Sequence, residues 1–500
     1  MTMRKYLIFS IMVILLTTSL LFACQAATTS PATDTATTEP AITATDTPQE
    51  TSVPTGLSTT SPSSTPLNSL SNNKITQYHF NAALSFEEDQ LAVGQAIDYT
   101  NTTGNILKEI PLVIPPKQVD GVFDLIFLFT SQTVETPQTH FDGAALWVTF
   151  PEPLEPSESV ELLLTYNLWI PEGRSLLGKT DRQLILTDWY PFIPPYLQTS
   201  GWLINEPSNI GEYLVYPLAD YWVNLSVFGS TDIAASIQPT IEDDSSFSVH
   251  KAENVRNVTF AFSPEYLEYT RDTEDVTIKA YVFPEHAELG QRAADLAADA
   301  WAFYENLYGD NPREYMAIIE ADLEDGMEYD GAFLLSQDYF ASADETPQNY
   351  FELLIVHETA HQWFYAQIAN DQANEPWLDE ALATYSELLY LEKTYPELVD
   401  WWWNYRVYAY QPMGWVDSTI YGHAGFRPYV NAVYLRGVQF LNDLRQRIGD
   451  DAFFAILRDY ATPDAMDTFR SSVDFFSLVA AYSSEDVSSL LERYFRNTQP

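Results

Sequence analysis

Two histidines lie four residues apart in a stretch whose apolar residues recur with helical spacing. The sequence His-Glu-Thr-Ala-His at residues 357–361 falls in the run Tyr350–Ala369, which predicts a helix. Positions i and i+4 share one helix face, with Cβ atoms about 5–6 Å apart, so the imidazoles of His357 and His361 can reach one ion. Neutral imidazoles are preferred zinc ligands. We therefore predict one zinc ion per chain, with packing or capping by the histidines as the alternative.

A carboxylate on a second predicted helix is the candidate third ligand. This helix begins near Asn374 and is expected to stop before Tyr395. Glu380 lies on it, separated from His361 by eighteen intervening residues, and offers a carboxylate oxygen to the zinc ion. Glu387 lies seven residues further on the same face and is a candidate for orienting a histidine ligand. The alternative for both glutamates is a solvent-facing helix surface.

Together these motifs resemble the gluzincin aminopeptidases, the family of aminopeptidase N. The resemblance is carried by His-Glu-x-x-His, by the eighteen-residue gap and by the sequence Trp-Leu-Asp-Glu-Ala-Leu-Ala at residues 377–383. Where the family has Asn-Glu-Gly, this chain has Asp379-Glu380-Ala381, which preserves the ligand. The resemblance covers roughly Tyr78 to Phe495. It implies a multidomain α+β protein, with an N-terminal all-β saddle or sandwich domain followed by a thermolysin-like, mostly helical zinc peptidase domain.

An upstream motif indicates how a substrate is held. Residues 325–329 read Asp-Gly-Met-Glu-Tyr and resemble the family's Gly-x-Met-Glu-Asn element, whose glutamate binds the free α-amino group. The resemblance therefore assigns substrate binding to Gly326, Met327 and Glu328. A carboxylate at a fixed distance from zinc pairs with an ammonium group and selects a chain end. The family's N-terminal domain adds a Gln or Glu to this site, for which the sequence offers no candidate.

Two further side chains are candidates for the chemistry itself. Glu358 lies between the histidines without being a ligand, so it is the candidate general base. Residues 433–437, Val-Tyr-Leu-Arg-Gly, resemble the family's Tyr-x-Lys-Gly segment, whose tyrosine stabilises the oxyanion. This resemblance assigns that role to Tyr434, where a hydrogen bond to developing charge contributes about 3–4 kcal/mol. His423 is the alternative donor.

The N-terminal residues predict export and a lipid anchor. Arg4 and Lys5 precede the largely apolar run Leu7–Phe22, which is shorter than a membrane-spanning helix requires. The run ends in Leu-Phe-Ala-Cys and resembles the lipobox of bacterial lipoproteins. We therefore expect a signal peptide at residues 1–23 and lipidation of Cys24, which would hold the protein on the extracytoplasmic face of a bacterial membrane. A plain secretory signal is the alternative.

Composition divides the rest of the chain. Residues 24–73 are rich in Thr, Ser and Pro and predict a disordered tether. Short β-branched and aromatic runs then predict an N-terminal β domain at residues 74–270. We expect the catalytic domain at residues 271–500, with one strand after Asp275, then helices at 287–308 and 349–369. We expect no counterpart of the family's large C-terminal helical domain, and therefore an open cleft.

The charge of the chain excludes nucleic acid as a partner. Seventy Asp and Glu against 24 Lys and Arg give a formal charge of −46, which repels phosphate backbones. A single cysteine excludes an intramolecular disulfide and a thiolate zinc cluster. The sequence thus predicts a zinc-dependent peptidase, an aminopeptidase that removes N-terminal residues from peptides outside the cell. The alternatives are a zinc endopeptidase, another zinc hydrolase such as an epoxide or ester hydrolase, and a non-catalytic surface binding lipoprotein.

Overall fold

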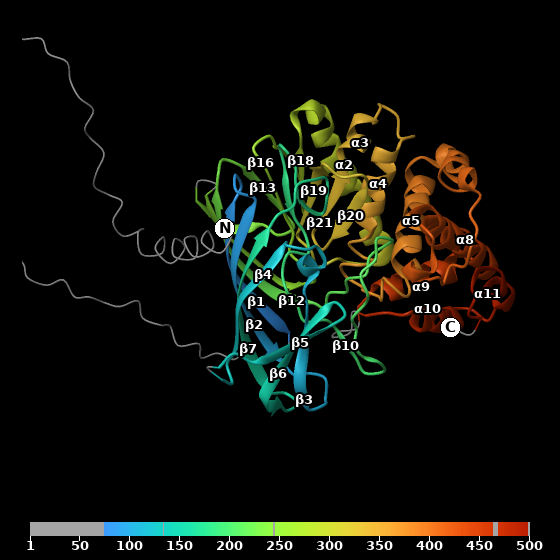
Figure 1. Ribbon diagram of the computed structural model, residues 1–500. Helices are drawn as coiled ribbons and strands as arrows, with labels where there is room; N and C mark the ends of the chain where they lie inside the picture. Colours follow the sequence, from blue (N-terminus) through green and yellow to red (C-terminus); the bar gives the residue numbers. More distant parts are fainter. Residues whose placement is uncertain (1–74, 134, 244–245, 464–468, 499–500) are drawn as a thin grey trace, which may run out of the picture. The chain divides into compact units, whose positions relative to one another are not determined.

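The computed structural model describes residues 75–133, 135–243, 246–463 and 469–498, all of which belong to one compact unit, Ser71–Pro500 (Figure 1). The predicted signal peptide, the candidate lipidation site Cys24 and the predicted tether lie outside the described residues. None of the described helices is both long enough and apolar enough to span a bilayer.

The N-terminal part of this unit is built from strands. Its largest sheet has seven strands in the order β14-β15-β12-β1-β2-β7-β4, and every pairing is antiparallel except that of β1 with β12. Alternate residues of β7 are buried, the period expected of a strand with one face on a core. The strands are β1 Thr76–Ser85, β2 Gln90–Thr100, β4 Phe123–Thr130, β7 Ser159–Trp169, β12 Ala219–Phe228, β14 Pro239–Asp243 and β15 Phe247–Val255.

Three smaller sheets complete the β-rich part, and aromatic side chains fill much of its core. The rings of Tyr78, Trp189, Tyr190 and Tyr221 are buried and contact one another. The smaller sheets contain β3 Leu107–Val113, β6 Ala145–Leu154 and β5 Gln138–Asp142; β13 Asp232–Ala235, β16 Phe260–Ser263, β9 Leu184–Leu186 and β8 Leu177–Lys179; and β10 Tyr196–Leu197 with β11 Gly201–Trp202.

A five-stranded sheet, in the order β17-β18-β19-β21-β20, supports the candidate site. Its strands are β17 Leu267–Asp272, β18 Thr277–Val282, β19 Tyr315–Ala321, β20 Gly326–Tyr329 and β21 Ala332–Ser336. The three central strands are parallel, and helix α2, Ala287–Tyr308, connects β18 to β19. The prediction of a single strand after Asp275 is therefore wrong. Both faces of β21 are buried, so its apolar run lacks the alternation that identifies a strand.

Helices form the C-terminal part, in yellow to red in Figure 1. They include α3 Gln337–Ala341, α4 Tyr350–Ala360, α5 Trp377–Thr394, α6 Val399–Trp402, α7 Phe426–Val430, α8 Arg436–Ile448, α9 Asp450–Ala461, α10 Ser472–Tyr482 and α11 Ser488–Tyr494. The side chain of Asn349 caps α4 by accepting a hydrogen bond from the amide of Glu352 at 2.9 Å. A β-rich region followed by mostly helical structure confirms the predicted fold class.

Helix α4 ends earlier than its sequence indicates. The prediction of a helix to Ala369 is wrong, because α4 stops at Ala360 and the chain then turns. The buried guanidinium of Arg256, from the β-rich part, donates hydrogen bonds to the carbonyls of Tyr365, Ala366 and Gln367 at 2.7–3.1 Å. These carbonyls have left the helical pattern, so a long-range contact overrides local periodicity here.

Candidate functional site

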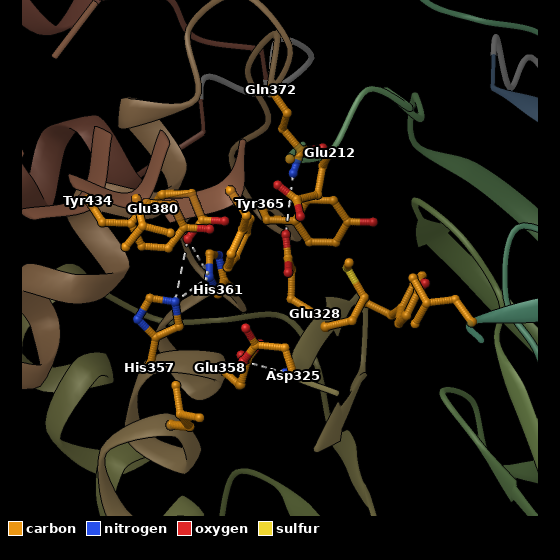
Figure 2. A pocket seen from close by; sticks show the side chains of 18 of the residues that line it. Glu212, Asp325, Glu328, His357, Glu358, His361, Tyr365, Gln372, Glu380 and Tyr434 are labelled. Atoms are coloured by element: carbon orange, nitrogen blue, oxygen red, sulfur yellow. Dashed lines mark hydrogen bonds and ion pairs between the residues drawn. The ribbon is translucent and has the colours of Figure 1, made fainter. Parts of the chain in front are cut away.

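Helices α4 and α5 bring together the three predicted zinc ligands (Figure 2). The Nε2 atoms of His357 and His361 are 3.2 Å apart, and Oε2 of Glu380 lies 3.5 Å from the first and 3.7 Å from the second. All three side chains are buried. One turn of α4 separates the histidines, and the first turn of α5 presents the glutamate, so both helix backbones fix the arrangement.

The geometry of these atoms fits a zinc ion. Ligand atoms about 2.0–2.1 Å from a tetrahedral metal lie about 3.3–3.4 Å from one another, close to the observed separations. No described hydrogen-bond donor reaches the buried Oε2 of Glu380. The Nδ1 atoms of His357 and His361 face carboxylates, so the neutral form of each ring keeps its proton on Nδ1 and presents a lone pair on Nε2. The two Nε2 atoms and Oε2 of Glu380 thus point toward one another with no hydrogen-bond donor between them. Such a group of electron-pair donors favours the binding of a cation.

A buried ion pair supports the first histidine. Oε1 of Glu387 lies 3.0 Å from Nδ1 of His357, as predicted from the helix spacing. The same carboxylate accepts hydrogen bonds from Arg406 and from the indole of Trp402, both at 2.9 Å. Burial raises the pKa of Glu387, but the charge of Arg406 and the bond to His357 outweigh this effect and lower it to about 2. Glu387 is therefore a permanent anion that orients the ligand.

The second histidine has its own carboxylate partner. Oδ1 of Asp379 lies 2.7 Å from Nδ1 of His361, and Gln372 donates a hydrogen bond to the other oxygen of Asp379 at 2.7 Å. Asp379 adjoins the ligand Glu380 on α5. The first turn of α5 thus supplies both the ligand Glu380 and the carboxylate of Asp379, which orients the ligand His361. This is the position at which the related motif has asparagine.

The candidate general base Glu358 lies beside the three ligands. Its side chain is buried, and no described donor reaches its Oε2. Burial raises the pKa of Glu358 to about 7, against the opposing charges of His357 and His361. Gly326 on β20 faces this carboxylate, while Met327 and Glu328 also line the cavity. The structure therefore brings all three predicted substrate-binding residues to the same site.

A second carboxylate at the substrate end comes from the β-rich part of the chain. Carboxylate oxygens of Glu212, Glu328 and Glu380 lie within 4.8 Å of one another. Burial raises the pKa of Glu212 to about 8, and the nearby charge of Glu380 adds to this shift. Sequence reasoning missed Glu212, which lies in an irregular segment between β11 and β12. Its one signal is an acidic side chain inside the largely apolar run Ile210–Tyr216.

The backbone at Gly211 explains how this segment reaches the site. Gly211 has φ +69°, and a Cβ there would lie 2.7–2.8 Å from side-chain atoms of Ile420 and Tyr429. Glycine therefore permits both the left-handed backbone and the close approach to the helical part. Glu212 follows directly and points into the cavity beside Glu328 and Gln372 (Figure 2).

Tyr434 lies beside Glu380, and its ring stacks parallel to that of His357 with centroids 6.3 Å apart. It belongs to a π-helical turn, Asn431–Leu435, a distortion that is frequent at functional sites. Burial and the charge of Glu380 hold the pKa of Tyr434 well above its usual value, so its hydroxyl remains a donor. His423 bonds to Ser418 at 2.9 Å and does not line the cavity. The structure thus places Tyr434, and not the alternative His423, at the site.

The cavity that contains these groups has a volume of about 540 Å³. Six carboxylates line it, from Asp188, Glu212, Asp325, Glu328, Glu358 and Glu380. Such a concentration of negative charge attracts cations and positively charged ligand groups. A helical histidine pair, a glutamate on the following helix and a buried glutamate beside them form the arrangement expected of a zinc metallopeptidase site of the gluzincin class.

Comparison with known proteins agrees with this class. Residues 303–494 match the model of the peptidase family M1 domain. The chain also has the fold of a mutant M1 zinc metallopeptidase of Deinococcus radiodurans, with a TM-score of 0.58 and 18% identity over 85% of this chain and 95% of that one. A mutant of that protein with the bound substrate Tyr-Ser-Ala gives a TM-score of 0.59 at 17% identity, with the same shares covered.

Curated relatives are similar over shorter stretches. Aminopeptidase 2 of Candida albicans is 24% identical over 276 residues, which are 49% of this chain and 29% of that protein. Endoplasmic reticulum aminopeptidase 1 of Homo sapiens is 27% identical over 199 residues, 36% of this chain and 20% of that protein. The chain therefore spans less than a third of the length of these relatives. The resemblance to gluzincin aminopeptidases that the motifs predicted is confirmed.

Proposed function

We propose that this protein is a zinc-dependent aminopeptidase. The observation that carries the proposal is the combination of a three-ligand zinc geometry with a pair of carboxylates, Glu212 and Glu328, next to the ligand Glu380. A peptide has one ammonium group at its N-terminus, and two adjacent carboxylates are a strong site for it. Because this anchor lies beside the zinc ligands, the bond presented for cleavage is the one after the first residue.

The zinc ligands and two neighbouring side chains each have a role in the proposed reaction. Zinc bound to His357, His361 and Glu380 would polarise the scissile carbonyl and lower the pKa of water. Glu358 accepts the proton of the attacking water and passes it to the departing amine. Tyr434 donates a hydrogen bond to the carbonyl oxygen as negative charge develops there.

The two anchoring carboxylates position the substrate. Glu328 projects from the edge strand β20 and Glu212 from the β-rich part, so two separate elements hold the substrate ammonium. A substrate ammonium group would supply the positive charge that stabilises both carboxylates, because no arginine or lysine pairs with either of them among the described residues. A blocked N-terminus would leave both carboxylates without a partner, which penalises acetylated peptides.

The test is an assay of the full-length protein on aminoacyl arylamides and on N-acetylated peptides. Wild type should cleave the arylamides, lose activity with a chelator and regain it with zinc. Glu358→Gln should lower kcat by about 10²–10⁴-fold, the usual contribution of a general base. Glu328→Ala should abolish arylamide cleavage yet spare some cleavage of blocked peptides. Full aminopeptidase activity in Glu328→Ala would overturn the anchoring role, and a wild-type preference for blocked peptides would indicate an endopeptidase.

We further propose that the protein acts outside the cytoplasm, anchored through Cys24. The support is the sequence itself: a basic start, an apolar run that ends in Leu-Phe-Ala-Cys, and a Thr/Ser/Pro-rich segment after it. Acyl chains would bind the membrane with about 0.8 kcal/mol per buried methylene. Cell fractionation tests this placement, since Cys24→Ala should move the protein from the membrane to the soluble fraction. A wild-type protein found in the soluble fraction would refute it.

A further inference from the structure

One positive charge in the acidic cavity has no carboxylate partner among the described residues. The cavity lining includes two arginines, Arg406 and Arg427. Arg406 is buried and bound to Glu387 at 2.9 Å. Arg427 is exposed in α7, and no described carboxylate lies within ion-pair distance of its guanidinium. Its guanidinium carbon lies 4.4 Å from the ring centroid of Tyr410, a contact that holds the side chain without neutralising it.

Contacts between side chains place Arg427 at a particular end of the cavity. The hydroxyl of Tyr410 lies 2.9 Å from that of Tyr350, the first residue of α4. The ring of Tyr350 in turn contacts Tyr339, whose hydroxyl donates to Asp325 at 2.7 Å. This chain of contacts runs along the N-terminal end of α4. Arg427 therefore belongs to the Tyr350 end of the cavity.

The proposed ammonium anchor occupies the opposite end. Gln372 donates hydrogen bonds to Glu328 at 3.4 Å and to Asp379 at 2.7 Å, and Asp379 holds His361 at the C-terminal end of α4. His361 follows Tyr350 by eleven positions along α4, which is about 16 Å at 1.5 Å per residue. An extended peptide advances about 3.3–3.6 Å per residue, so this distance corresponds to about four to five residues.

The same direction follows from β20. The strand runs from Gly326 to Tyr329, with Glu328 near its end and Asp325 just before its start. Asp325 contacts the Tyr339 and Tyr350 group, whereas Glu328 contacts Gln372. A substrate whose ammonium group meets Glu328 therefore extends its remaining residues toward Asp325, Tyr350 and Arg427.

We propose that Arg427 binds a carboxylate on the leaving-group side of the substrate, and so selects short peptides whose C-terminal carboxylate, or an acidic side chain close to it, reaches this end of the cavity. An arginine offers a planar pair of donors that matches a carboxylate. Carboxylates line other parts of the cavity, and Asp325 lies at this same end, so the attraction of a substrate carboxylate rests on the guanidinium of Arg427. The inference depends on the proposed aminopeptidase function, because that function fixes the substrate direction.

The experiment compares matched substrates in the full-length protein. The substrates are an alanine tetrapeptide as the free acid, the same tetrapeptide amidated at its C-terminus, and an amidated tetrapeptide with aspartate as its fourth residue. An alanyl arylamide, which carries no such carboxylate, reports on the proposed function itself. The readout is the ratio of kcat/KM for acid to amide, which cancels any general effect of a substitution on folding or catalysis.

Wild type should prefer the free acid about tenfold, the ratio that corresponds to about 1.4 kcal/mol. The preference should lie in KM, because Arg427 is remote from the reacting atoms. Arg427→Gln should bring the ratio close to one, and Arg427→Lys should retain part of it. The exposed Arg496, which does not line the cavity, provides the matched control: Arg496→Gln should keep the wild-type ratio.

Each outcome has a defined meaning. If the amidated peptide with aspartate regains the rate of the free acid, the bound carboxylate can come from a side chain. If it does not, the site recognises the C-terminal carboxylate of the peptide. A wild-type ratio near one, or a ratio that persists in Arg427→Gln, would overturn the inference. Failure of the wild type to cleave the arylamide would instead refute the aminopeptidase function, so the two failures are distinguishable.

Discussion

A Cβ atom at Gly326 would lie 2.5 Å from Oε1 of Glu358, so the glycine on β20 leaves the space that the candidate general base occupies. The obstructed atom is the end of a flexible side chain, and it would move before the backbone does. We therefore expect Gly326→Ala to displace the Glu358 carboxylate without unfolding the protein. A displacement of about 1 Å can lower kcat/KM about a hundredfold.

Kinetics and thermal denaturation of Gly326→Ala check this prediction together. The expected result is a large loss of arylamide cleavage, with a melting temperature close to that of wild type and unchanged zinc content. Gly425 provides a control, since a Cβ there meets no atom within 4 Å. Wild-type activity in Gly326→Ala would show that the position of Glu358 is not set by this contact.

The carboxylate of Asp379 should strengthen zinc binding through His361. Removal of a group that orients a metal ligand typically lowers metal affinity by about 10–100-fold. We expect this loss for Asp379→Ala, measured by competition with a fluorescent zinc chelator. Asp379→Asn keeps an oxygen acceptor for Nδ1 of His361 and should retain most of the affinity. Equal affinities of Asp379→Ala and wild type would contradict the assigned role.

The hydroxyl of Tyr434 should act on the transition state more than on the bound substrate. Loss of one donor to the oxyanion costs about 10²–10³-fold in kcat. We expect Tyr434→Phe to show this loss with little change in KM and with wild-type zinc content. His423→Gln, at the position that the structure separates from the cavity, should behave as wild type. Wild-type kcat in Tyr434→Phe together with a large loss in His423→Gln would instead assign oxyanion stabilisation to His423.

The sequence was informative where chemistry depends on local spacing. The i and i+4 histidines and Glu387 could be predicted from helical spacing, and Glu380 could be predicted from the motif around it and the gap of eighteen residues that separates it from His361. Glu212 could not be predicted in this way. It reaches the site from a segment without periodicity, and it is separated from Glu328 by more than a hundred residues of chain.

Two errors in the predicted elements have physical causes of the same kind. The strands β19 and β21 were missed because parallel strands covered on both faces carry no alternating pattern. The end of α4 was placed too late because the apolar spacing continues past Ala360, whereas the buried Arg256 draws the following carbonyls out of the helix. Long-range contacts decided both features, and a single sequence does not display them.

Arg256 itself should be essential for stability. Besides the carbonyls of Tyr365, Ala366 and Gln367, it donates a hydrogen bond to the carbonyl of Tyr216 at 3.1 Å. Each buried carbonyl left without a donor costs about 1–3 kcal/mol. We therefore expect Arg256→Met to lower the free energy of unfolding by at least about 3 kcal/mol. Denaturant unfolding measures this change.

The control for that experiment is the exposed Arg496, where Arg496→Met should change the free energy of unfolding by no more than about 0.5 kcal/mol. If Arg256→Met were as stable as the control, the segment 361–368 would hold its conformation without the arginine. The physical account of where α4 ends would then be wrong.

The most direct test of the central claim is the zinc stoichiometry and affinity of the full-length protein, measured in wild type and in Glu380→Gln. The account predicts one tightly bound zinc ion per wild-type chain and a loss of affinity of at least about a hundredfold when the third ligand loses its charge. A wild-type protein that binds no zinc, or a Glu380→Gln protein that binds it as tightly as wild type, would contradict the account.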